Sequence, residues 1–381
     1  MSSSDAAQPA TAGQGNGAPL LDVEHLQVLF PIKSGVIIDR QVGQVHAVDD
    51  VSFALSEGET LGIVGESGCG KTTLIRVLVR LIDATSGSIR FHGRDITASN
   101  RRQLEPIRRE MQMVFQDPQA SLNPRKRVAQ ILATPLRIRG VPKDRLVTES
   151  RSLLERVGLP REAMNRFPHE FSGGQRQRIG IARALAVDPK LILLDEPVSA
   201  LDVSIQAQVI NLLGELQDEL HLSYIFVAHD LSVVRHVSDR IVVMYLGKLM
   251  EISPAEELYS KPIHPYTSAL LGAIPIPDPK QNRARTRLVV SGEVPNPINP
   301  PSGCRFHTRC PLATEICRTI EPPLTEYAGG HAAACHHPQH VTAAEIAAAT
   351  RSEASPLSAG SELPEGPAEV SAAAKGSGIN A

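Results

Sequence analysis

Short apolar runs that end in glycine or polar residues divide this chain into alternating strand and helix segments. The run Leu61 to Val64 is followed by a glycine-rich loop and then by Leu74, Val77, Leu78 and Leu81 at helical spacing. Leu191 to Leu194 and Ser223 to Ala228 have the length and composition of parallel strands that are buried on both faces. The pattern therefore predicts an α/β fold.

The flanking regions follow other patterns. Leu20 to Val28 alternates as an edge strand does, Phe30 to Gly43 has the composition of a loop insertion, and a hairpin is expected to turn at Gly247. Residues 97–188 are predicted to be mainly helical, with one helix ended by Gly158. The strand-rich core would thus stop near residue 96 and resume near residue 189.

Composition limits the class of protein. With 381 residues and 42% hydrophobic content, the chain can bury a sizeable core, whereas residues 1–19 and 341–381 are polar or small and are predicted to be disordered. No apolar run approaches the roughly 18 residues that span a bilayer, and the start lacks the features of a signal peptide. The formal charge of −2 argues against nucleic acid as the main partner.

The loop after the first buried strand fits G-x-x-x-x-G-K-[ST], between a strand and a helix, where a phosphate cradle is expected. Its glycines let backbone N–H groups point at a polyphosphate, and the helix N-terminus adds partial positive charge. Lys71 should reach the β- and γ-phosphates, and the Thr72 hydroxyl should bind Mg²⁺. The predicted cradle comprises Gly65, Ser67, Gly68, Cys69, Gly70, Lys71, Thr72 and Thr73. We interpret Cys69 as a small filler there.

Two acidic residues, Asp195 and Glu196, end the second buried strand. Burying carboxylates is costly unless a cation or another partner compensates for the lost hydration. We therefore predict that Asp195 belongs to the Mg²⁺ shell, through water, and that Glu196 activates the water that attacks the γ-phosphate.

Four further features are weak when each is taken alone. Ser172-Gly173-Gly174-Gln175 opens a predicted helix and is either an anion site or a plain N-cap. Gln116 follows an apolar run, Asp202 lies shortly after the acidic pair, and His229 ends a strand, where a histidine more often has a structural role.

Together and in this order, the motifs resemble the ATP-binding subunit of ABC transporters over about residues 20–340. The resemblance implies a P-loop NTPase fold with a RecA-like core, an antiparallel β subdomain and a helical subdomain at about 97–188, within an ATPase domain at 20–260. It assigns Gly65 to Thr72 to Walker A, and Asp195 and Glu196 to Walker B. Ser172, Gly173, Gly174 and Gln175 correspond to the signature, and Asp202 corresponds to the D-loop. Gln116 corresponds to the Q-loop, which senses Mg²⁺, and His229 to the switch histidine, which contacts the γ-phosphate.

The same resemblance implies that two such domains close head to tail, so that each signature acts on the ATP of its partner. One departure concerns the aromatic residue that usually stacks on adenine, because residues 41–48 contain none. Phe30 lies too far upstream to be assigned from the sequence, and Val42 and His46 are the candidates for packing against the base. The preference for ATP over GTP stays open.

Cys304, Cys310, Cys317 and Cys335 cluster in a proline-rich region near the C-terminus. Clustered thiols in a cytosolic protein indicate a metal rather than disulfides, and unligated reduced thiols are the alternative. The spacing does not select the metal. A zinc site could be completed by histidines, and the candidates are His307, His331, His336 and His337.

A closer resemblance covers this region. Ser302 to Pro311, with Cys317, His331 and Ala334 to His336, is similar to the C-terminal extension of oligopeptide and dipeptide importer ATPases. Three further segments match that subfamily, namely His264 to Thr267, Gly292 to Pro295 and Asp202 to Gln208. The resemblance implies an extension at residues 261–340 in which the four cysteines hold a [4Fe-4S] cluster.

The implied function is ATP hydrolysis that powers import of di- or oligopeptides from the cytoplasmic face of the membrane. The implied partners are two permease subunits, a second and often different ATPase subunit, and an extracytoplasmic binding protein. Nickel, glutathione and oligosaccharides are alternative solutes within the subfamily. Two other classes are a soluble ABC ATPase outside transport and a metal-sensing adaptor that binds ATP without turnover.

Overall fold

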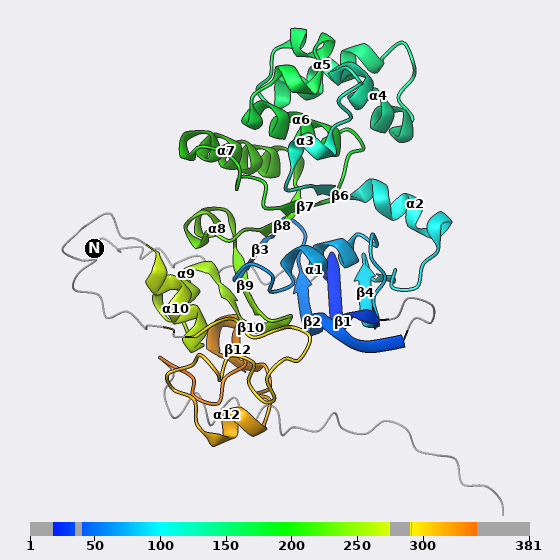
Figure 1. Cartoon of the computed structure of the whole chain (residues 1–381). Helices are drawn as coiled ribbons and strands as arrows, with labels where there is room; N and C mark the ends of the chain where they lie inside the picture. Colours follow the sequence, from blue (N-terminus) through cyan, green and yellow to red (C-terminus); the bar gives the residue numbers. More distant parts are fainter. Residues whose placement is uncertain (1–17, 35–39, 275–289, 291, 341–381) are drawn as a thin grey trace, which may run out of the picture.

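The computed structural model describes residues 18–34, 40–274, 290 and 292–340 (Figure 1). The two segments that were predicted to be disordered lie outside the described residues, apart from positions 18 and 19. In the part of the chain that is described, no helix combines the length and the apolar character needed to cross a membrane.

A sheet of eight strands forms the centre, in the order β11-β12-β10-β9-β3-β8-β7-β6. Five neighbouring strands, from β9 to β6, run parallel, and β10, β11 and β12 extend the sheet in antiparallel fashion. The bounds are β3 Thr60–Val64, β6 Met111–Val114, β7 Leu191–Asp195, β8 Ser223–Val227, β9 Arg240–Tyr245, β10 Lys248–Pro254, β11 Thr325–Tyr327 and β12 His331–Ala333. The predicted α/β fold with wholly buried strands is confirmed.

One strand of this sheet corrects the sequence prediction. β6 lies inside the stretch 97–188, which was expected to be mainly helical and outside the core, yet it pairs in parallel with β7. Its four residues, Met111 to Val114, follow directly on a helix, so the apolar run is too short to separate a strand from a helix end.

A second, antiparallel sheet has the order β2-β1-β4-β5. It comprises β1 Leu21–Ser34, β2 Arg40–Leu55, β4 Ser86–Phe91 and β5 Arg94–Asp95. Two predictions were wrong here: β1 is an interior strand, and the expected loop insertion continues the β1–β2 ladder, with Phe30 opposite Val45 and Ile32 opposite Gly43. Register shifts along β1 interrupt the period-two pattern on which a sequence-based strand assignment depends.

The helices cover the sheets and build the region at the top of Figure 1. α1 contacts strands of both sheets and buries Leu74, Ile75, Val77 and Leu78. α5 ends before Gly158, whose φ of +69° suits the predicted glycine stop. The helix bounds are α1 Lys71–Leu78, α2 Arg101–Glu110, α3 Pro118–Ser121, α4 Val128–Arg139, α5 Leu146–Arg156, α6 Gly173–Leu185, α7 Val203–Leu220, α8 Leu231–Val237, α9 Ala255–Ser260, α10 Pro265–Ala273 and α12 Glu315–Thr319. Within the described residues, 3₁₀ turns span Arg161–Asn165, Pro168–Glu170 and Ala328–Gly330.

The C-terminal extension joins the central sheet through its own strands. β12 pairs with β10, and a buried carboxylate, Glu251 on β10, fixes the junction. Glu251 accepts hydrogen bonds from the backbone N–H groups of Ile263 and His264, and it pairs with His331 Nε2 at 2.6 Å. The extension is thus anchored by sheet pairing and by a buried polar contact between His331 and Glu251.

Candidate functional site

The loop between β3 and α1 has a backbone that only glycine adopts easily. Gly65, Gly68 and Gly70 have φ values of +152°, +79° and +107°. A Cβ at Gly65 would lie 2.2 Å from the carbonyl oxygen of Met244, and one at Gly70 would lie 2.0 Å from that of Ala47. The glycines are therefore required for two reasons. They adopt the backbone conformation of the loop, and they let the backbone at Met244 and at Ala47 approach it closely.

Lys71 lies inside this loop and is only 5% exposed. Its Nζ donates to the carbonyl oxygens of Gly65, at 2.7 Å, and Glu66, at 3.1 Å. Gly70 is the N-cap of α1, and among the described residues no side chain caps this end. A buried cation beside an uncapped helix N-terminus is suited to binding an anion.

Thr72 and Asp195 come together below the loop. Thr72 Oγ1 donates to Asp195 Oδ1 at 3.1 Å, and Asp195 is 1% exposed. Burial raises the pKa of Asp195 above its ordinary value, against the lowering effects of the Thr72 hydrogen bond and of the nearby cations Arg76 and Lys71. A hydroxyl and a carboxylate are hard oxygen donors, so this pair fits Mg²⁺.

The side chain of Glu196 meets two other predicted residues. Its Oε2 accepts a hydrogen bond from Gln116 Nε2 at 2.8 Å and lies 3.5 Å from His229 Nδ1. The three residues follow the carboxyl ends of β6, β7 and β8, which are neighbours in the parallel sheet. Sheet topology thus assembles a carboxylate with an amide and an imidazole, a set that can accept a proton and orient a water molecule.

A cavity of about 390 Å³ is lined by the phosphate loop together with Gln116 and Glu196. Four apolar residues, Phe30, Val45, Ala47 and Pro297, also contribute to the lining. The lining residues are Phe30, Val45, Ala47, Ser67, Gly68, Gly70, Lys71, Thr72, Thr73, Gln116, Glu196 and Pro297.

Two of the apolar residues were missed or left unassigned from the sequence. Phe30 is brought to the cavity by the β1–β2 ladder, which the sequence did not reveal, and Pro297 lies more than 200 residues after the phosphate loop. The two candidates for packing against a base, Val42 and His46, do not belong to the lining that the described residues form. Val42 is 61% exposed, and His46 Nδ1 lies 3.2 Å from Asp49 Oδ2.

The signature segment caps its own helix. Ser172 Oγ accepts from the backbone N–H of Gln175 at 3.3 Å, and the Gln175 side chain accepts from the backbone N–H of Ser172 at 3.1 Å. Gly174 packs so closely on α7 that a Cβ would lie 2.4 Å from Ile205 Cγ2. Neither the signature nor Asp202, the N-cap of α7, lines the cavity in the described part of this single chain. Figure 1 shows α6 in the upper helical region, well above α1.

The four cysteines of the extension are free thiols. Burial, assisted by the neighbouring thiols, raises the pKa of Cys304 to about 11 and that of Cys335 to about 12. Cys304 and Cys317 are also joined through their backbones, because the N–H of Cys304 donates to the carbonyl oxygen of Cys317 at 2.8 Å. Within the described residues, however, no three histidine, cysteine or acidic side chains are arranged to hold a metal ion.

The histidines proposed as alternative zinc ligands have other partners. His331 pairs with Glu251, and His337 Nε2 lies 2.7 Å from Thr314 Oγ1. A ring nitrogen of His307 and one of His336 each lie 2.9 Å from a backbone carbonyl oxygen, that of Cys304 and that of Ile320. In the phosphate loop, Cys69 is 3% exposed and burial raises its pKa, so the thiol is kept protonated.

Comparison with known proteins supplies independent information. Residues 48–199 match the model of the ABC transporter family, and residues 250–317 match the model described as oligopeptide/dipeptide transporter, C-terminal region. The oligopeptide transport ATP-binding protein AppF of Bacillus subtilis is 54% identical over 84% of this chain and 98% of its own length. OppF of Haemophilus influenzae, with the same description, is 51% identical over 83% of this chain and 96% of its own.

Solved structures agree on the fold. CbiO1 from Clostridium perfringens, part of the ABC transporter complex cbiONQ, aligns with a TM-score of 0.55 at 28% identity, covering 64% of this chain and 91% of its own. The ATP-binding cassette MJ0796, solved as a dimer in a post-hydrolysis state with ADP and Pi, aligns with a TM-score of 0.55 at 27% identity, covering 62% and 98%.

Proposed function

The chain belongs to the family of oligopeptide transport ATP-binding proteins of ABC transporters, and from this we infer that it hydrolyses ATP to power the import of peptides. The observation that carries this inference is the contact of Glu196 with Gln116 and His229 beside the phosphate loop. A carboxylate that lines the same cavity as the phosphate loop supports its role as the proton acceptor next to the γ-phosphate.

The side chains divide the chemistry among them. Lys71 exchanges its hydrogen bonds to the loop carbonyls for bonds to the β- and γ-phosphates, while the uncapped end of α1 supplies backbone N–H groups. Thr72 and Asp195 would hold Mg²⁺, which would supply positive charge beside the phosphates. Glu196 accepts the proton of the attacking water, and His229 and Gln116 orient the water and the γ-phosphate.

The signature works in a dimer. Ser172, Gly173 and Gly174 lie outside the cavity of their own chain, so we infer that they act on the ATP of a second cassette, with Asp202 at the interface. The dimeric form in which the similar cassette MJ0796 was solved supports this arrangement. The second cassette, identical or different, pairs with this chain beneath two permease subunits at the cytoplasmic face of the membrane, and an extracytoplasmic binding protein delivers the peptide.

We infer that the base of the nucleotide packs against the apolar residues of the cavity lining. Phe30 supplies an aromatic face there, and Val45 and Pro297 supply aliphatic surface. Phe30 is 39% exposed in this chain, which leaves its ring available to a ligand. Stacking on an aromatic face tolerates different bases, so these contacts favour binding more than they favour adenine over guanine.

The test uses Glu196→Gln in the assembled transporter. The variant keeps the hydrogen-bonding shape but cannot accept the proton, so steady-state ATP hydrolysis should fall by about 10² or more while ATP binding persists. Retention of ATP in a closed dimer, measured with radiolabelled nucleotide, would support the role. Full hydrolysis by the variant would remove Glu196 from it.

We also propose that Cys304, Cys310, Cys317 and Cys335 hold a [4Fe-4S] cluster that stabilises the extension. Four soft sulfur donors within one short extension support a metal cluster, and the other three thiols contribute to the raised pKa of Cys335. Iron and acid-labile sulfide analysis of protein purified without oxygen tests this. A colourless, zinc-loaded protein would refute the cluster.

A further inference from the structure

The C-terminal extension reaches back to the phosphate loop and holds one of its residues at two points. The carboxylate of Glu66, the second residue of the loop, accepts a hydrogen bond from Arg309 Nη1 at 2.8 Å. The backbone N–H of Glu66 donates to the hydroxyl of Tyr266 at 3.0 Å. Both partners belong to residues 261–340, so side chain and backbone of the same loop residue depend on the extension.

The contact to Arg309 is largely shielded from water. The Arg309 side chain is 10% exposed and that of Glu66 is 28% exposed. The hydrogen bond to Glu66 raises the pKa of Arg309, and the guanidinium also contacts the ring of Tyr245. A charged hydrogen bond that is screened so little fixes the Glu66 side chain more firmly than a surface pair would.

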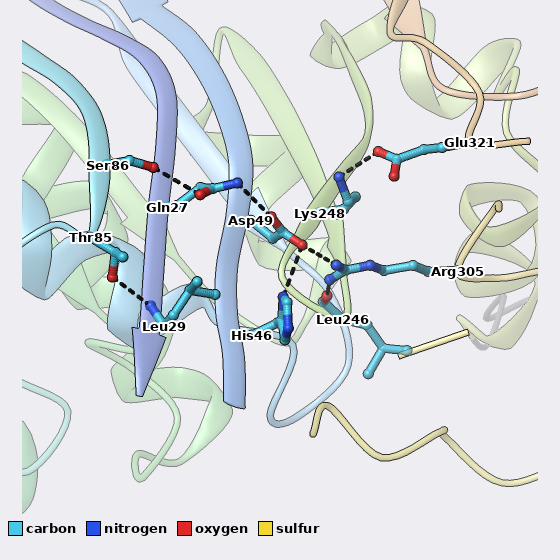
Figure 2. A network of polar contacts seen from close by, with 10 residues as sticks. All are labelled: Gln27, Leu29, His46, Asp49, Thr85, Ser86, Leu246, Lys248, Arg305 and Glu321. Carbon is cyan, nitrogen blue, oxygen red and sulfur yellow. Dashed lines mark hydrogen bonds and ion pairs between the residues drawn. The ribbon is translucent and has the colours of Figure 1, made fainter. Parts of the chain in front are cut away.

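A second connection passes through the turn between β9 and β10. The N–H of Gly247 donates to the carbonyl oxygen of Cys69 at 2.8 Å, and the carbonyl oxygen of Gly247 accepts from the N–H of Asp49 at 2.9 Å. Arg305 of the extension donates to the carbonyl oxygen of Leu246 and to the carboxylate of Asp49 (Figure 2). Arg305 therefore bonds Leu246 in the turn and also Asp49, which bonds the next residue of the turn, Gly247. Gly247 in turn bonds Cys69 of the phosphate loop.

The contact between Arg305 and Asp49 joins two charged side chains. Burial would raise the pKa of Asp49, but the charge of Arg305, together with Lys248 and His46, lowers it below the ordinary value, so Asp49 is ionised. Arg305 is 5% exposed. Figure 2 also shows Lys248 paired with Glu321, which ties the extension to β10 without touching the phosphate loop.

We propose that Arg309 and Arg305 are positioning residues through which the extension sets the phosphate loop for nucleotide binding. The loop binds phosphate through its backbone, so small displacements of Glu66 or Cys69 alter the direction of the N–H groups that bind it. The two arginines lie between Cys304 and Cys310, so the cysteine region is joined to the ATP site through their contacts with Asp49 and Glu66. The proposal rests on ATP use by this chain and not on the identity of the solute.

The experiment compares nucleotide binding and turnover. Arg309→Ala should raise the KM for MgATP of the assembled transporter, and the Kd of the full chain for MgADP by calorimetry, about tenfold. The kcat should stay within about twofold because Glu196 is untouched. Arg309→Lys, which keeps the charge, should recover part of the affinity. A purely structural role would instead reduce the amount of folded protein and leave the KM of the surviving fraction unchanged.

Glu321→Gln is the matched control. It weakens a contact of the same extension that does not reach the loop, so the KM should not change. An unchanged KM in Arg309→Ala, or an equal increase in Glu321→Gln, would overturn the proposal. If Arg309→Ala does not fold, Glu66→Ala removes the acceptor of the same contact from the ATPase side, and unchanged MgADP affinity there would also overturn it. Failure of the unsubstituted chain to bind MgADP would instead contradict the proposed function.

Discussion

Two glycine-rich helix N-termini in this chain look alike in sequence and differ in structure. At α1, Gly70 is the N-cap, and no side chain among the described residues satisfies the free N–H groups. At α6, Ser172 and Gln175 form a reciprocal capping box. The α1 end also contains a buried cation, Lys71, whereas the α6 end is closed by its own side chains.

The difference shows how the work is divided. The uncapped N-terminus of α1, with its glycine-type φ values, leaves backbone N–H groups without side-chain acceptors among the described residues. A phosphate can accept hydrogen bonds from these groups. The α6 cap satisfies the N–H of Gln175 only, so in the proposed dimer the N–H groups of Gly173 and Gly174 would be available to the ligand of another subunit. In the proposed dimer, one chain would supply a complete phosphate loop and the signature half of a second site.

The same substitution at the two ends should have very different effects. Gly70→Ala places a Cβ 2.0 Å from the Ala47 carbonyl oxygen at a φ of +107°, so nucleotide affinity should fall about 100-fold or more. Gly173→Ala meets only the flexible end of Leu201 at 3.3 Å, so the affinity of the isolated chain should be unchanged. Equal losses, measured by calorimetry with MgADP, would contradict the distinction.

A third N-terminus, that of α10, should make stability depend on pH. His264 caps it, with Nδ1 accepting from the N–H of Tyr266, and burial lowers the pKa of His264 to about 4. Below about pH 6.5 the histidine is protonated in the unfolded chain but stays neutral in the folded chain. The contribution of His264 to the free energy of unfolding is therefore fully present above that pH. It should fall by about 3 kcal/mol as the pH drops from 6.5 to 4.

His264→Asn isolates this effect, since asparagine can still accept the capping hydrogen bond but does not titrate. Denaturant unfolding of both proteins across pH 4 to 7 measures the difference. A constant gap in stability between them over this range would show that His264 is not the titrating group.

Removing the α6 cap should cost stability but not nucleotide binding by the isolated chain. Ser172→Ala deletes the acceptor for the Gln175 N–H, which should lower the free energy of unfolding by about 1 kcal/mol. ATP hydrolysis by the assembled transporter should also decrease, because the partner's ATP loses a hydroxyl contact. Ser172→Thr, which restores a capping oxygen, is the control; loss of MgADP binding by the isolated Ala variant would contradict the division of roles.

The smallest effect is expected at the apolar lining of the α1 site. Phe30→Ala removes the aromatic face from the cavity and should raise the KM for ATP about three- to tenfold. Val42→Ala, at an exposed position outside the cavity lining, should leave the KM unchanged. A KM change at Val42 and none at Phe30 would reverse the assignment of the base contact.

The sequence predicted most of the parallel sheet because its strands are continuous apolar runs, and β3, β7 and β8 were located correctly. It failed at β1, where bulges break the alternation, and at β6, where four residues are too few to show a period. Because residues from Phe30 onward were assigned to a loop and not to β1, the sequence did not predict that Phe30 lines the same cavity as the phosphate loop.

By itself, the sequence determined the backbone of the phosphate loop, because eight consecutive residues encode glycine conformations, a cation and a helix start in one place. Only the tertiary structure decided what surrounds that loop. Phe30, Pro297, Arg305 and Arg309 reach it from distant segments through sheet pairing and buried ion pairs. Such contacts depend on how separate elements pack, and no local periodicity records them.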